Sequence, residues 1–223
     1  VDDIILTRND MEEIARIKQA LAEEFEVKDL GPLRYFLRME VARSKEGIFV
    51  SQRKYTLDLL KETGMLGCRP ASTPMDSKKK LGREEEGVPV DKGRYQHLVG
   101  KLIYLSHTRP DIGFAVSTIS QFMNNPMEEH MEAVHQILRY LKRTPGKGLL
   151  FRKTDYRDVI LFSDADWAGS QIDSRSTTGY CSFVWGNLMT WRNKIQSVVS
   201  RSSAESELRA LAITICEGIW ISE

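Results

Sequence analysis

The stretch Val159–Gly169, VILFSDADWAG, combines an apolar strand pattern with a pair of acids. Four consecutive apolar residues open it, and such a run is typical of a strand buried on both faces, in the middle of a sheet. Asp164 and Asp166 follow where the run stops. Because side chains alternate along a strand, two residues that are two apart lie on one side and can offer their carboxylates to one divalent cation. In a simpler interpretation, Asp166 and Gly169 only open a surface turn.

A second acidic segment, Ser202–Ile219, favours the metal-binding interpretation. Its apolar residues recur at the spacing of an amphipathic helix, so one helix face is predicted to pack on the sheet. These apolar residues are Leu208, Leu211, Ala212, Ile215 and Ile219. Ser202 and Glu205 have the spacing of a capping box, which gives Glu205 a structural role. Glu207 lies at the edge of the predicted buried face, where an unpaired carboxylate is costly, and a metal ion shared with Asp164 would offset that cost.

Two segments resemble one known domain, in order along the chain. The first is FSDADWAG (Phe162–Gly169), and the second is DSRSTTGYCSFVWGNLMTWRNKIQSVVSRSSAESELRALA (173–212). Together they resemble the ribonuclease H domain of copia-type LTR retrotransposon Pol polyproteins, and they are most similar to the plant forms. The resemblance extends from Phe162 to the end of the chain and joins an acidic strand, a Gly-Asn hairpin and an acidic helix.

This resemblance implies a metal-dependent nuclease. In that family a carboxylate cluster holds two Mg²⁺ ions, which activate a water molecule and stabilise the leaving oxygen as the RNA strand of an RNA/DNA hybrid is cut. Residue by residue, Asp164 takes the place of the first-strand aspartate and Glu207 that of the helix glutamate, with Glu205 as the second choice. The further acids of the family lie beyond this helix, and the chain ends at Glu223 before supplying them.

The beginning of the chain resembles a different metal site. The residues VDDIIL place Asp2 and Asp3 before an apolar strand, and a helix is predicted over Asp10–Phe25. This order resembles the end of the YVDD motif of reverse transcriptases, in which the first aspartate of the pair binds the catalytic magnesium ions. The family completes that site with an aspartate from an earlier strand, which is missing here. In the alternative interpretation, the acid pair is simply solvated.

Two further segments resemble parts of a reverse transcriptase. DLGPLRYFLRMEV (Asp29–Val41) resembles the counterpart of the primer grip, although the family more often has glycine at the position of Arg38. Arg38 either contacts a phosphate or reflects drift of this copy. YQHLVGKLIYLSHTRPDIGFAVSTISQF (Tyr95–Phe122) resembles the thumb and connection signature of copia elements, and within it Arg109 and Asp111 are expected to cap and pair locally.

Periodicity and turn residues predict the other elements. A helix is expected within Ser51–Met65, ending at Gly64, with Tyr55, Leu59 and Leu60 on its inward face. Further helices are expected over two parts of Asp91–Met123 that are separated at Arg109–Asp111, and over Met127–Lys142. Hairpins are expected from Tyr35–Val41 with Gly47–Val50, and from Ser176–Trp185 with Leu188–Trp191 around the turn Gly186-Asn187.

Three more basic residues are candidates for contacts with nucleic acid. Arg139 and Lys142 lie near the end of the helix Met127–Lys142. They either face the backbone of a hybrid duplex or complement the negative end of the helix dipole. Arg175 either contacts the duplex or belongs to an ordinary turn before a strand.

Composition sets the broad class. The chain has 223 residues, of which 41% are hydrophobic and 28% charged, with a net charge of +1, so it is expected to fold as a globular protein. We expect no membrane partner, because no apolar run approaches the length of a membrane span. The three cysteines are scattered and odd in number, which is typical of reduced thiols in an intracellular protein, in a cytoplasmic particle or in the nucleus.

The combined prediction is an α+β or α/β chain in three parts. Residues 1–75 are expected to form palm hairpins of a reverse transcriptase and the start of its thumb, and residues 76–147 a loop and the helical thumb and connection. Residues 148–223 are expected to form a ribonuclease H-like mixed sheet with a packed helix, truncated at its C-terminus.

The resemblance implies that the parent enzyme copies RNA into DNA and cuts the RNA strand of the hybrid. Its partners would be an RNA/DNA hybrid or a template-primer, and the N-terminal palm and fingers of the same polyprotein. We expect the isolated chain to be inactive, because both Mg²⁺ sites are incomplete. The alternative is a host-retained, non-catalytic module that binds nucleic acid or serves as a scaffold.

Overall fold

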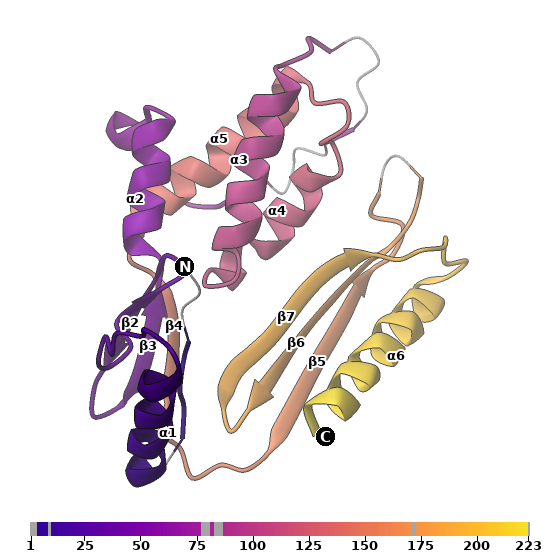
Figure 1. Ribbon diagram of the computed structural model, residues 1–223. Helices are drawn as coiled ribbons and strands as arrows, with labels where there is room; N and C mark the ends of the chain where they lie inside the picture. Colours follow the sequence, from indigo (N-terminus) through magenta and orange to yellow (C-terminus); the bar gives the residue numbers. More distant parts are fainter. Residues whose placement is uncertain (1–3, 9, 77–80, 83–86, 171–172, 223) are drawn as a thin grey trace.

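Two antiparallel sheets and six α-helices make up the described part of the computed structural model, which comprises residues 4–8, 10–76, 81–82, 87–170 and 173–222 (Figure 1). The helices are α1 (Met11–Glu24), α2 (Arg53–Glu62), α3 (Lys92–Leu105), α4 (Gly113–Ser120), α5 (Glu128–Arg143) and α6 (Ser203–Ser222). The strands are β1 (Tyr35–Phe36), β2 (Met39–Arg43), β3 (Gly47–Ser51), β4 (Gly148–Arg152), β5 (Val159–Asp166), β6 (Thr177–Val184) and β7 (Asn187–Ile195). This confirms the α+β class. The prediction of a mixed sheet near the C-terminus was wrong, because β5–β7 pair only in antiparallel fashion.

The first sheet has the order β1-β2-β3-β4 and joins distant parts of the chain. Its last strand, β4, follows the helices and pairs antiparallel with β3, so that Gly148 lies opposite Ser51. A Cβ atom at Gly148 would overlap the carbonyl oxygen of Val50, so this close pairing requires glycine. The sheet therefore combines residues of the first and the third predicted parts. The predicted single strand Tyr35–Val41 is interrupted by a turn at Leu37 and Arg38.

The hydrophobic core lies among α2, α3, α4 and α5. Helix α2 buries Tyr55, Leu59 and Leu60, as its periodicity predicts, and it is followed by Gly64 in the left-handed conformation. The predicted break between α3 and α4 is confirmed, with Pro110 opening a short 3₁₀ turn. The fully buried apolar members of this core are Tyr95, Val99, Leu102, Leu105, Ile112, Ile119, Val134, Ile137, Leu138 and Leu141.

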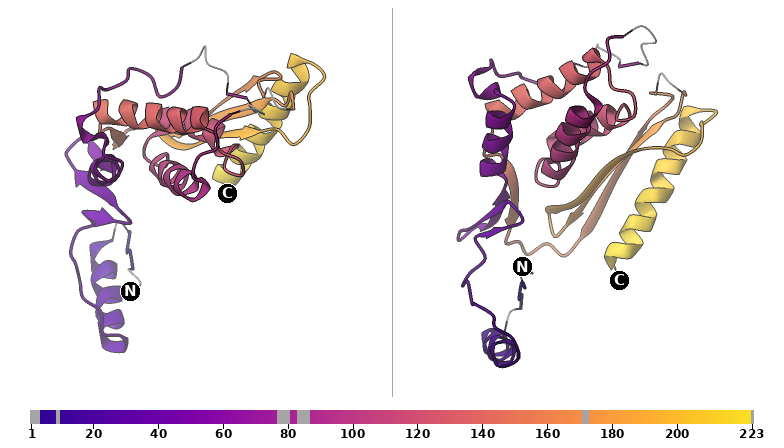
Figure 2. Two further views of the ribbon diagram at one scale, coloured as in Figure 1. Left: turned by 90° about the horizontal axis from the view of Figure 1, so that it is seen from above. Right: turned by 45° about the horizontal axis from the view of Figure 1, so that its top comes forward.

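Helix α1 lies within the predicted range Asp10–Phe25 and is capped by Asp10, but it buries no residue. The Asp10 carboxylate accepts hydrogen bonds from the backbone N–H groups of Glu12 and Glu13, at 2.9 and 3.2 Å. The two views of Figure 2 show α1 standing apart from α3, α4 and the second sheet. The apolar residues of α1 therefore pack on none of these elements.

The second sheet, β5-β6-β7, lies between α6 and the helices α3 and α4 (Figure 1). Strands β6 and β7 form the predicted hairpin, but the turn is Trp185-Gly186, one residue earlier than expected, with φ values of 53° and 74°. The side chain of Trp191 donates to the carbonyl oxygen of Ser106 at 3.2 Å, and Ser117 donates to that of Asn193 at 3.3 Å. These bonds fix β7 against the helices.

Strand β5 is an edge strand within the described part of the chain, so its predicted place in the middle of a sheet was wrong. Helix α6 covers only the face that carries Leu161, and Ile160 and Phe162 on the other face are 47% and 57% exposed. An apolar run indicates that a strand can be buried on both faces, but it does not determine whether other elements of the fold cover both faces.

The predicted buried face of α6 was also wrong. The helix packs on the sheet through the small residues Ser206, Ala210, Thr214 and Gly218, and the Cβ of a side chain at Gly218 would lie 2.5 Å from Leu161 Cδ1. Small residues allow this close approach, and they turn the larger apolar residues of the helix outward. Among the described helices, none has the length and apolar character needed to cross a bilayer.

Candidate functional site

Asp164 lies on the face of β5 that α6 does not cover. Ser163, its neighbour, pairs with Tyr180, whose hydroxyl donates to Glu217 of α6 at 3.1 Å. The side chains of Ser163 and Leu161 therefore share the face covered by α6, and alternation places Asp164 on the opposite face, where it is exposed. Within the described residues, no hydrogen bond or ion pair holds its carboxylate.

Glu207 lies at the same end of β5 but comes from α6. The Gln196 side-chain amide donates to Thr178 at 3.1 Å and to the carbonyl oxygen of Ser206 at 2.9 Å, and Thr178 pairs with Ala165. The first turns of α6 therefore lie level with Ala165, one residue beyond Asp164. Glu207 is exposed, so the burial cost inferred from the sequence does not arise.

Asp164 thus lies on the uncovered face of β5, whereas Glu207 belongs to the helix that covers the opposite face. Both carboxylates are hard oxygen donors, which suit Mg²⁺, and Mg²⁺ is commonly held by one or two carboxylates together with water and substrate phosphate. Among the described residues, no group of three or more His, Cys, Asp or Glu side chains is placed to hold a metal ion. The carboxylates of Asp164 and Glu207 are of the donor type that suits the ion.

Asp166 shares the face of Asp164 but holds the following turn. Its carboxylate accepts a hydrogen bond from the backbone N–H of Thr177, and a Cβ atom at Gly169 would overlap this carboxylate. The simpler interpretation of Asp166 and Gly169 as turn residues is therefore supported by their contacts.

Glu205 is held at the beginning of α6, as the capping-box spacing predicts. Its N–H donates to the Ser202 hydroxyl at 3.2 Å, and its carboxylate accepts from the Arg201 N–H at 2.8 Å. The Arg209 side chain reaches the same carboxylate at 2.8 Å. The hydrogen bonds from Arg209 and from the Arg201 backbone lower the pKa of Glu205. By contrast, no such bond holds Glu207 in the described part of the chain.

Arg38 lies in the turn between β1 and β2, with its guanidinium 5.4 Å from the centre of the Tyr55 ring. Its φ is 62° and that of Leu37 is 45°, in the left-handed region. Glycine adopts this region without the penalty that other residues incur, which explains why glycine suits this position.

The other basic candidates already have protein partners. Arg139 donates to the Gln136 side chain at 2.6 Å, and Lys142 donates to the carbonyl oxygen of Cys68. Arg175 forms an ion pair with Asp173 at 3.3 Å. Asp2 and Asp3 lie outside the described residues.

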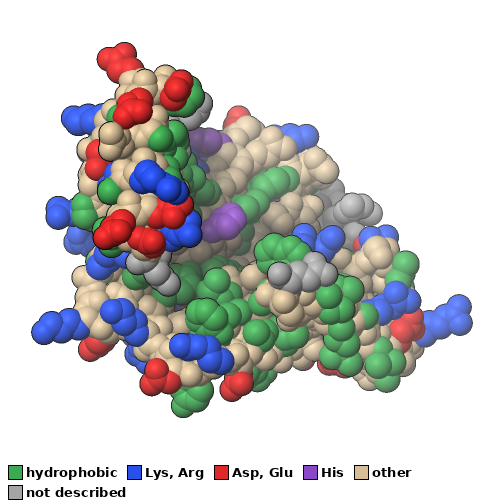
Figure 3. Space-filling view, turned by 60° about the horizontal axis from the view of Figure 1, so that its bottom comes forward, with side chains coloured by type: hydrophobic (Ala, Val, Ile, Leu, Met, Phe, Trp, Pro, Cys, Tyr) green, Lys and Arg blue, Asp and Glu red, His purple; other side chains and the backbone are tan. Residues whose placement is uncertain are grey.

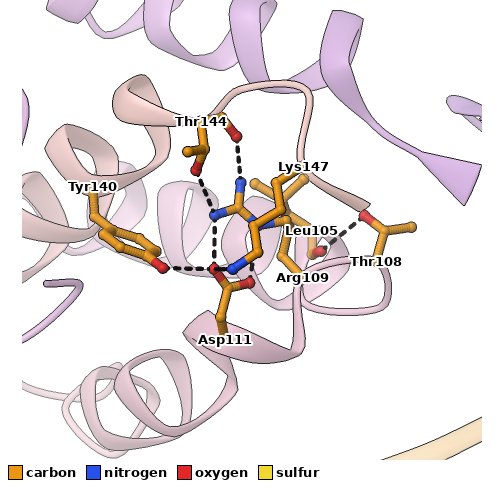
Figure 4. A network of polar contacts seen from close by, with 7 residues as sticks. All are labelled: Leu105, Thr108, Arg109, Asp111, Tyr140, Thr144 and Lys147. Carbon is orange, nitrogen blue, oxygen red and sulfur yellow. Dashed lines mark hydrogen bonds and ion pairs between the residues drawn. The ribbon is translucent and has the colours of Figure 1, made fainter. Parts of the chain in front are cut away.

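The expected local pair of Arg109 and Asp111 is the centre of a larger polar network (Figure 4). Arg109, which is 1% exposed, makes two hydrogen bonds to Asp111 at 2.9 and 2.8 Å and reaches the carbonyl oxygen of Thr144 at 2.9 Å. Tyr140 and Lys147 also donate to Asp111, at 2.7 and 3.2 Å. The sequence indicated the pair but not these distant partners, because only the fold brings α5 and its following turn to Arg109.

Comparison with known proteins gives the family. The model of the family described as reverse transcriptase (RNA-dependent DNA polymerase) matches residues 1–77. The Pol polyprotein of the Arabidopsis thaliana transposon RE1 is 42% identical over 221 residues, which cover 99% of this chain and 15% of that protein. The Pol polyprotein of the Nicotiana tabacum transposon TNT 1-94 is 38% identical over 232 residues, covering 99% of this chain and 17% of that protein.

A shorter relative is of about the same length as this chain. An uncharacterised mitochondrial protein of Arabidopsis thaliana is 40% identical over 222 residues, covering 100% of this chain and 92% of that protein. No solved structure matches the chain significantly. This chain spans about 15% of the Pol polyprotein from RE1. The matches over its whole length show that it belongs to the Pol polyprotein family of copia-type retrotransposons, with a reverse transcriptase-related first part.

Proposed function

We propose that this chain is a section of an RNA-directed DNA polymerase and ribonuclease H that copies RNA into DNA and cuts the RNA strand of the hybrid. In this proposal residues 1–75 belong to the palm and the start of the thumb, 76–147 to the thumb and connection, and 148–223 to the ribonuclease H part. The reverse transcriptase family match over residues 1–77 and the Pol relatives over the whole chain support it.

The proposed nuclease site consists of Asp164 and Glu207. The observation that carries it is their placement at one end of β5, combined with the lack of hydrogen bonds or ion pairs to either carboxylate within the described residues. Asp166 and Glu205, the neighbouring acids, are held by Thr177 and by Arg201 and Arg209. When bound, Mg²⁺ would activate a water molecule and stabilise the leaving oxygen. Asp164 and Glu207 would bind the ion through their carboxylate oxygens and position it at the strand edge.

The isolated 223-residue chain should show no polymerase activity and little or no nuclease activity. Two carboxylates are fewer than the cluster that the family resemblance implies, and catalysis by a metal clamp depends on holding both ions in place. Weak binding to an RNA/DNA hybrid, decreasing with added salt, is the activity that we expect to remain.

A Mg²⁺-dependent cleavage assay on an RNA/DNA hybrid tests this site. The assay uses a longer Pol section that cuts the hybrid. In it, Asp164→Asn and Glu207→Gln should each lower the cleavage rate by more than roughly 100-fold. Loss of a residue that only hydrogen-bonds a metal ligand lowers activity by up to about that factor. Glu205→Gln is the matched control, and it should retain the rate within a few-fold. Equal rates for Asp164→Asn and the unaltered protein would exclude the proposed site. Cleavage by the isolated chain that disappears in Asp164→Asn would overturn its proposed inactivity.

The second candidate is a host-retained module that binds nucleic acid or serves as a scaffold without catalysis. The mitochondrial protein of similar length favours this candidate, because the match to this chain covers 92% of that protein. The two candidates differ in their genomic surroundings. Palm and integrase-like reading frames on both sides favour a section of a mobile element, whereas a start codon and a stop codon that bound these residues favour the retained module.

A further inference from the structure

Four buried polar residues join the second sheet to the beginning of α6. Their hydrogen bonds run from β6 through the connection between β7 and α6 into the helix, and we refer to the four as the polar bridge. They are Thr178, Gln196, Ser200 and Ser206, each of which is at most 5% exposed. Gln196 lies at the centre of the polar bridge, because its side chain bonds each of the other three residues.

The side-chain amide of Gln196 uses both its nitrogen and its oxygen. The Nε2 atom donates to the Thr178 hydroxyl at 3.1 Å and to the carbonyl oxygen of Ser206 at 2.9 Å. The Oε1 atom accepts from the Ser200 hydroxyl at 2.8 Å. Because a carbonyl oxygen only accepts, the nitrogen side of the amide must face Ser206, so the amide has one orientation.

The polar bridge connects the two segments that carry the proposed metal ligands. Ser206 directly precedes Glu207 in α6. Thr178 pairs with Ala165, which directly follows Asp164 in β5. A shift of Ser206 relative to Thr178 would therefore change the separation of the two carboxylates.

The turn after β5 is tied to the polar bridge as well. The Trp167 indole N–H donates to the carbonyl oxygen of Ser200 at 3.0 Å. The backbone N–H of Ala168 donates to the Ser176 hydroxyl at 3.1 Å, and the Ser176 carbonyl oxygen accepts from the backbone N–H of Gln196 at 2.8 Å. The polar bridge is thus anchored both at the end of β5 and in the first turns of α6.

Further along α6, the contact with the sheet is mainly apolar. Gly218 packs against Leu161 beside the groove, and the hydrogen bond from Tyr180 to Glu217 adds one polar contact. Hydrophobic side chains also gather at several places on the face that Figure 3 shows. Burial of apolar surface stabilises a fold but has little directional preference, so it tolerates small shifts of a packed helix. A fully bonded buried network, by contrast, specifies one arrangement.

We propose that Gln196 is a positioning residue of the nuclease site, which sets the location of Glu207 relative to Asp164 and thereby the affinity of the site for Mg²⁺. This inference rests on the proposed function and deepens it, because it adds the residue that aligns the two carboxylates. Gln196 is buried, so it acts through the backbone at Ser206 and not by contact with the ion or the substrate.

A longer Pol section that cuts an RNA/DNA hybrid tests this role through the Mg²⁺ concentration that gives half of the maximal cleavage rate. Gln196→Met keeps an unbranched side chain and removes the amide, and it should raise this concentration about 10-fold, at the lower end of the effect that partners of metal ligands have. Binding of Mg²⁺ without substrate gives a second measurement, because an ion that binds the folded state raises the unfolding midpoint. This rise should be smaller in Gln196→Met than in the unaltered section.

The matched control is Ser182→Ala. Ser182 is 0% exposed in the same sheet, and its hydroxyl lies 2.6 Å from that of Thr190, so this variant also removes a buried hydrogen bond. Both variants should unfold at a lower temperature, but Ser182→Ala should keep the unaltered Mg²⁺ requirement. The same Mg²⁺ requirement in Gln196→Met as in Ser182→Ala would overturn the role of Gln196. If Gln196→Met does not fold, Thr178→Val, which removes one bond of the polar bridge, decides in the same way.

A double-mutant cycle with Glu207→Gln separates positioning from stability. Once the Glu207 carboxylate is lost, Gln196→Met should change the residual cleavage rate little, because nothing remains for it to position. Equal fold-losses in the presence and absence of Glu207 would show a structural role and overturn the inference alone. Full cleavage by Asp164→Asn and by Glu207→Gln would overturn the proposed site, and the inference with it.

Discussion

At the scale of single residues, Asp111 accepts four side-chain hydrogen bonds, which come from Arg109, Tyr140 and Lys147. Burial alone would raise the pKa of Asp111, but hydrogen bonds from Arg109, Tyr140 and Lys147 outweigh burial and hold the pKa well below its usual value. Removing one partner of such a pair leaves the other charge buried and uncompensated. In this network the uncompensated group would be Arg109, which is 1% exposed.

Asp111→Asn should lower the free energy of unfolding by about 3 kcal/mol, because it leaves Arg109 without its ion pair. Urea unfolding followed by circular dichroism measures the change. Asp173→Asn is the control, since the Asp173–Arg175 pair is solvent-exposed and should contribute less than about 1 kcal/mol. Similar losses for both variants would show that the Arg109 network does not stabilise the fold.

The same acid predicts how stability depends on pH. The folded-state pKa of Asp111 is depressed, so its stabilising contribution is complete above the ordinary aspartate pKa of about 4 and is lost as the pH falls through lower values. The difference in unfolding free energy between the unaltered chain and Asp111→Asn should therefore shrink as the pH is lowered from 6 to 2.5. A difference that stays constant over this range would contradict the assignment.

At the scale of elements, the sequence correctly predicted the buried face of a helix where that face follows the spacing of large apolar residues. Helix α2 buries the predicted residues Tyr55, Leu59 and Leu60. The faces of α6 were predicted incorrectly, because hydrophobicity identifies the larger apolar side chains, whereas the small residues from Ser206 to Gly218 allow the closest approach to β5. Asp164 and Glu207 were predicted from the order of the two acidic segments along the chain. Their positions on different sides of β5 depend on how α6 packs on the sheet, which the hydrophobic pattern did not predict.

The pairing of β3 with β4 depends on a single glycine. Gly148→Ala should lower stability by about 2 kcal/mol, because its Cβ would overlap the backbone oxygen of Val50 and the strands would have to separate. Gly100→Ala, inside α3, should instead raise stability by about 0.5 to 1 kcal/mol, because nothing lies within 4 Å of the added atom and alanine favours the helix. Thermal unfolding of the two variants should give shifts of opposite sign, and shifts of the same sign would be evidence against the β3–β4 register.

At the scale of the whole molecule, α6 presents a large apolar surface to solvent. Leu208, Leu211, Ile215 and Ile219 are 66%, 46%, 49% and 58% exposed. An open groove of about 460 Å³ lies between the C-terminal half of α6 and β5, and it is lined by Val159, Leu161, Ile215, Gly218, Ile219 and Ser222. Exposed apolar surface of this kind promotes association.

Replacing Leu208 and Ile215 together by lysine should increase the monomeric fraction of the isolated chain without lowering its melting temperature. Size-exclusion chromatography with light scattering gives the monomeric fraction. Ala210→Lys, on the buried side of the same helix, should instead destabilise the chain, because Ala210 is 0% exposed. A monomeric fraction unchanged by the double replacement would show that this face does not drive association.

The segment Lys153–Asp158 is the covalent link between the two sheets, since β4 ends at Arg152 and β5 begins at Val159. Lys153 and Arg157 are exposed there, so brief trypsin treatment should nick the chain at this link. The nicked halves should still co-elute under native conditions, because Asn187 hydrogen-bonds the Arg152 backbone at 2.6 and 3.1 Å and Trp191 bonds Ser106. Such a split protein would allow either half to be exchanged for a variant and reassembled, so that the two halves of a Pol section could be studied independently.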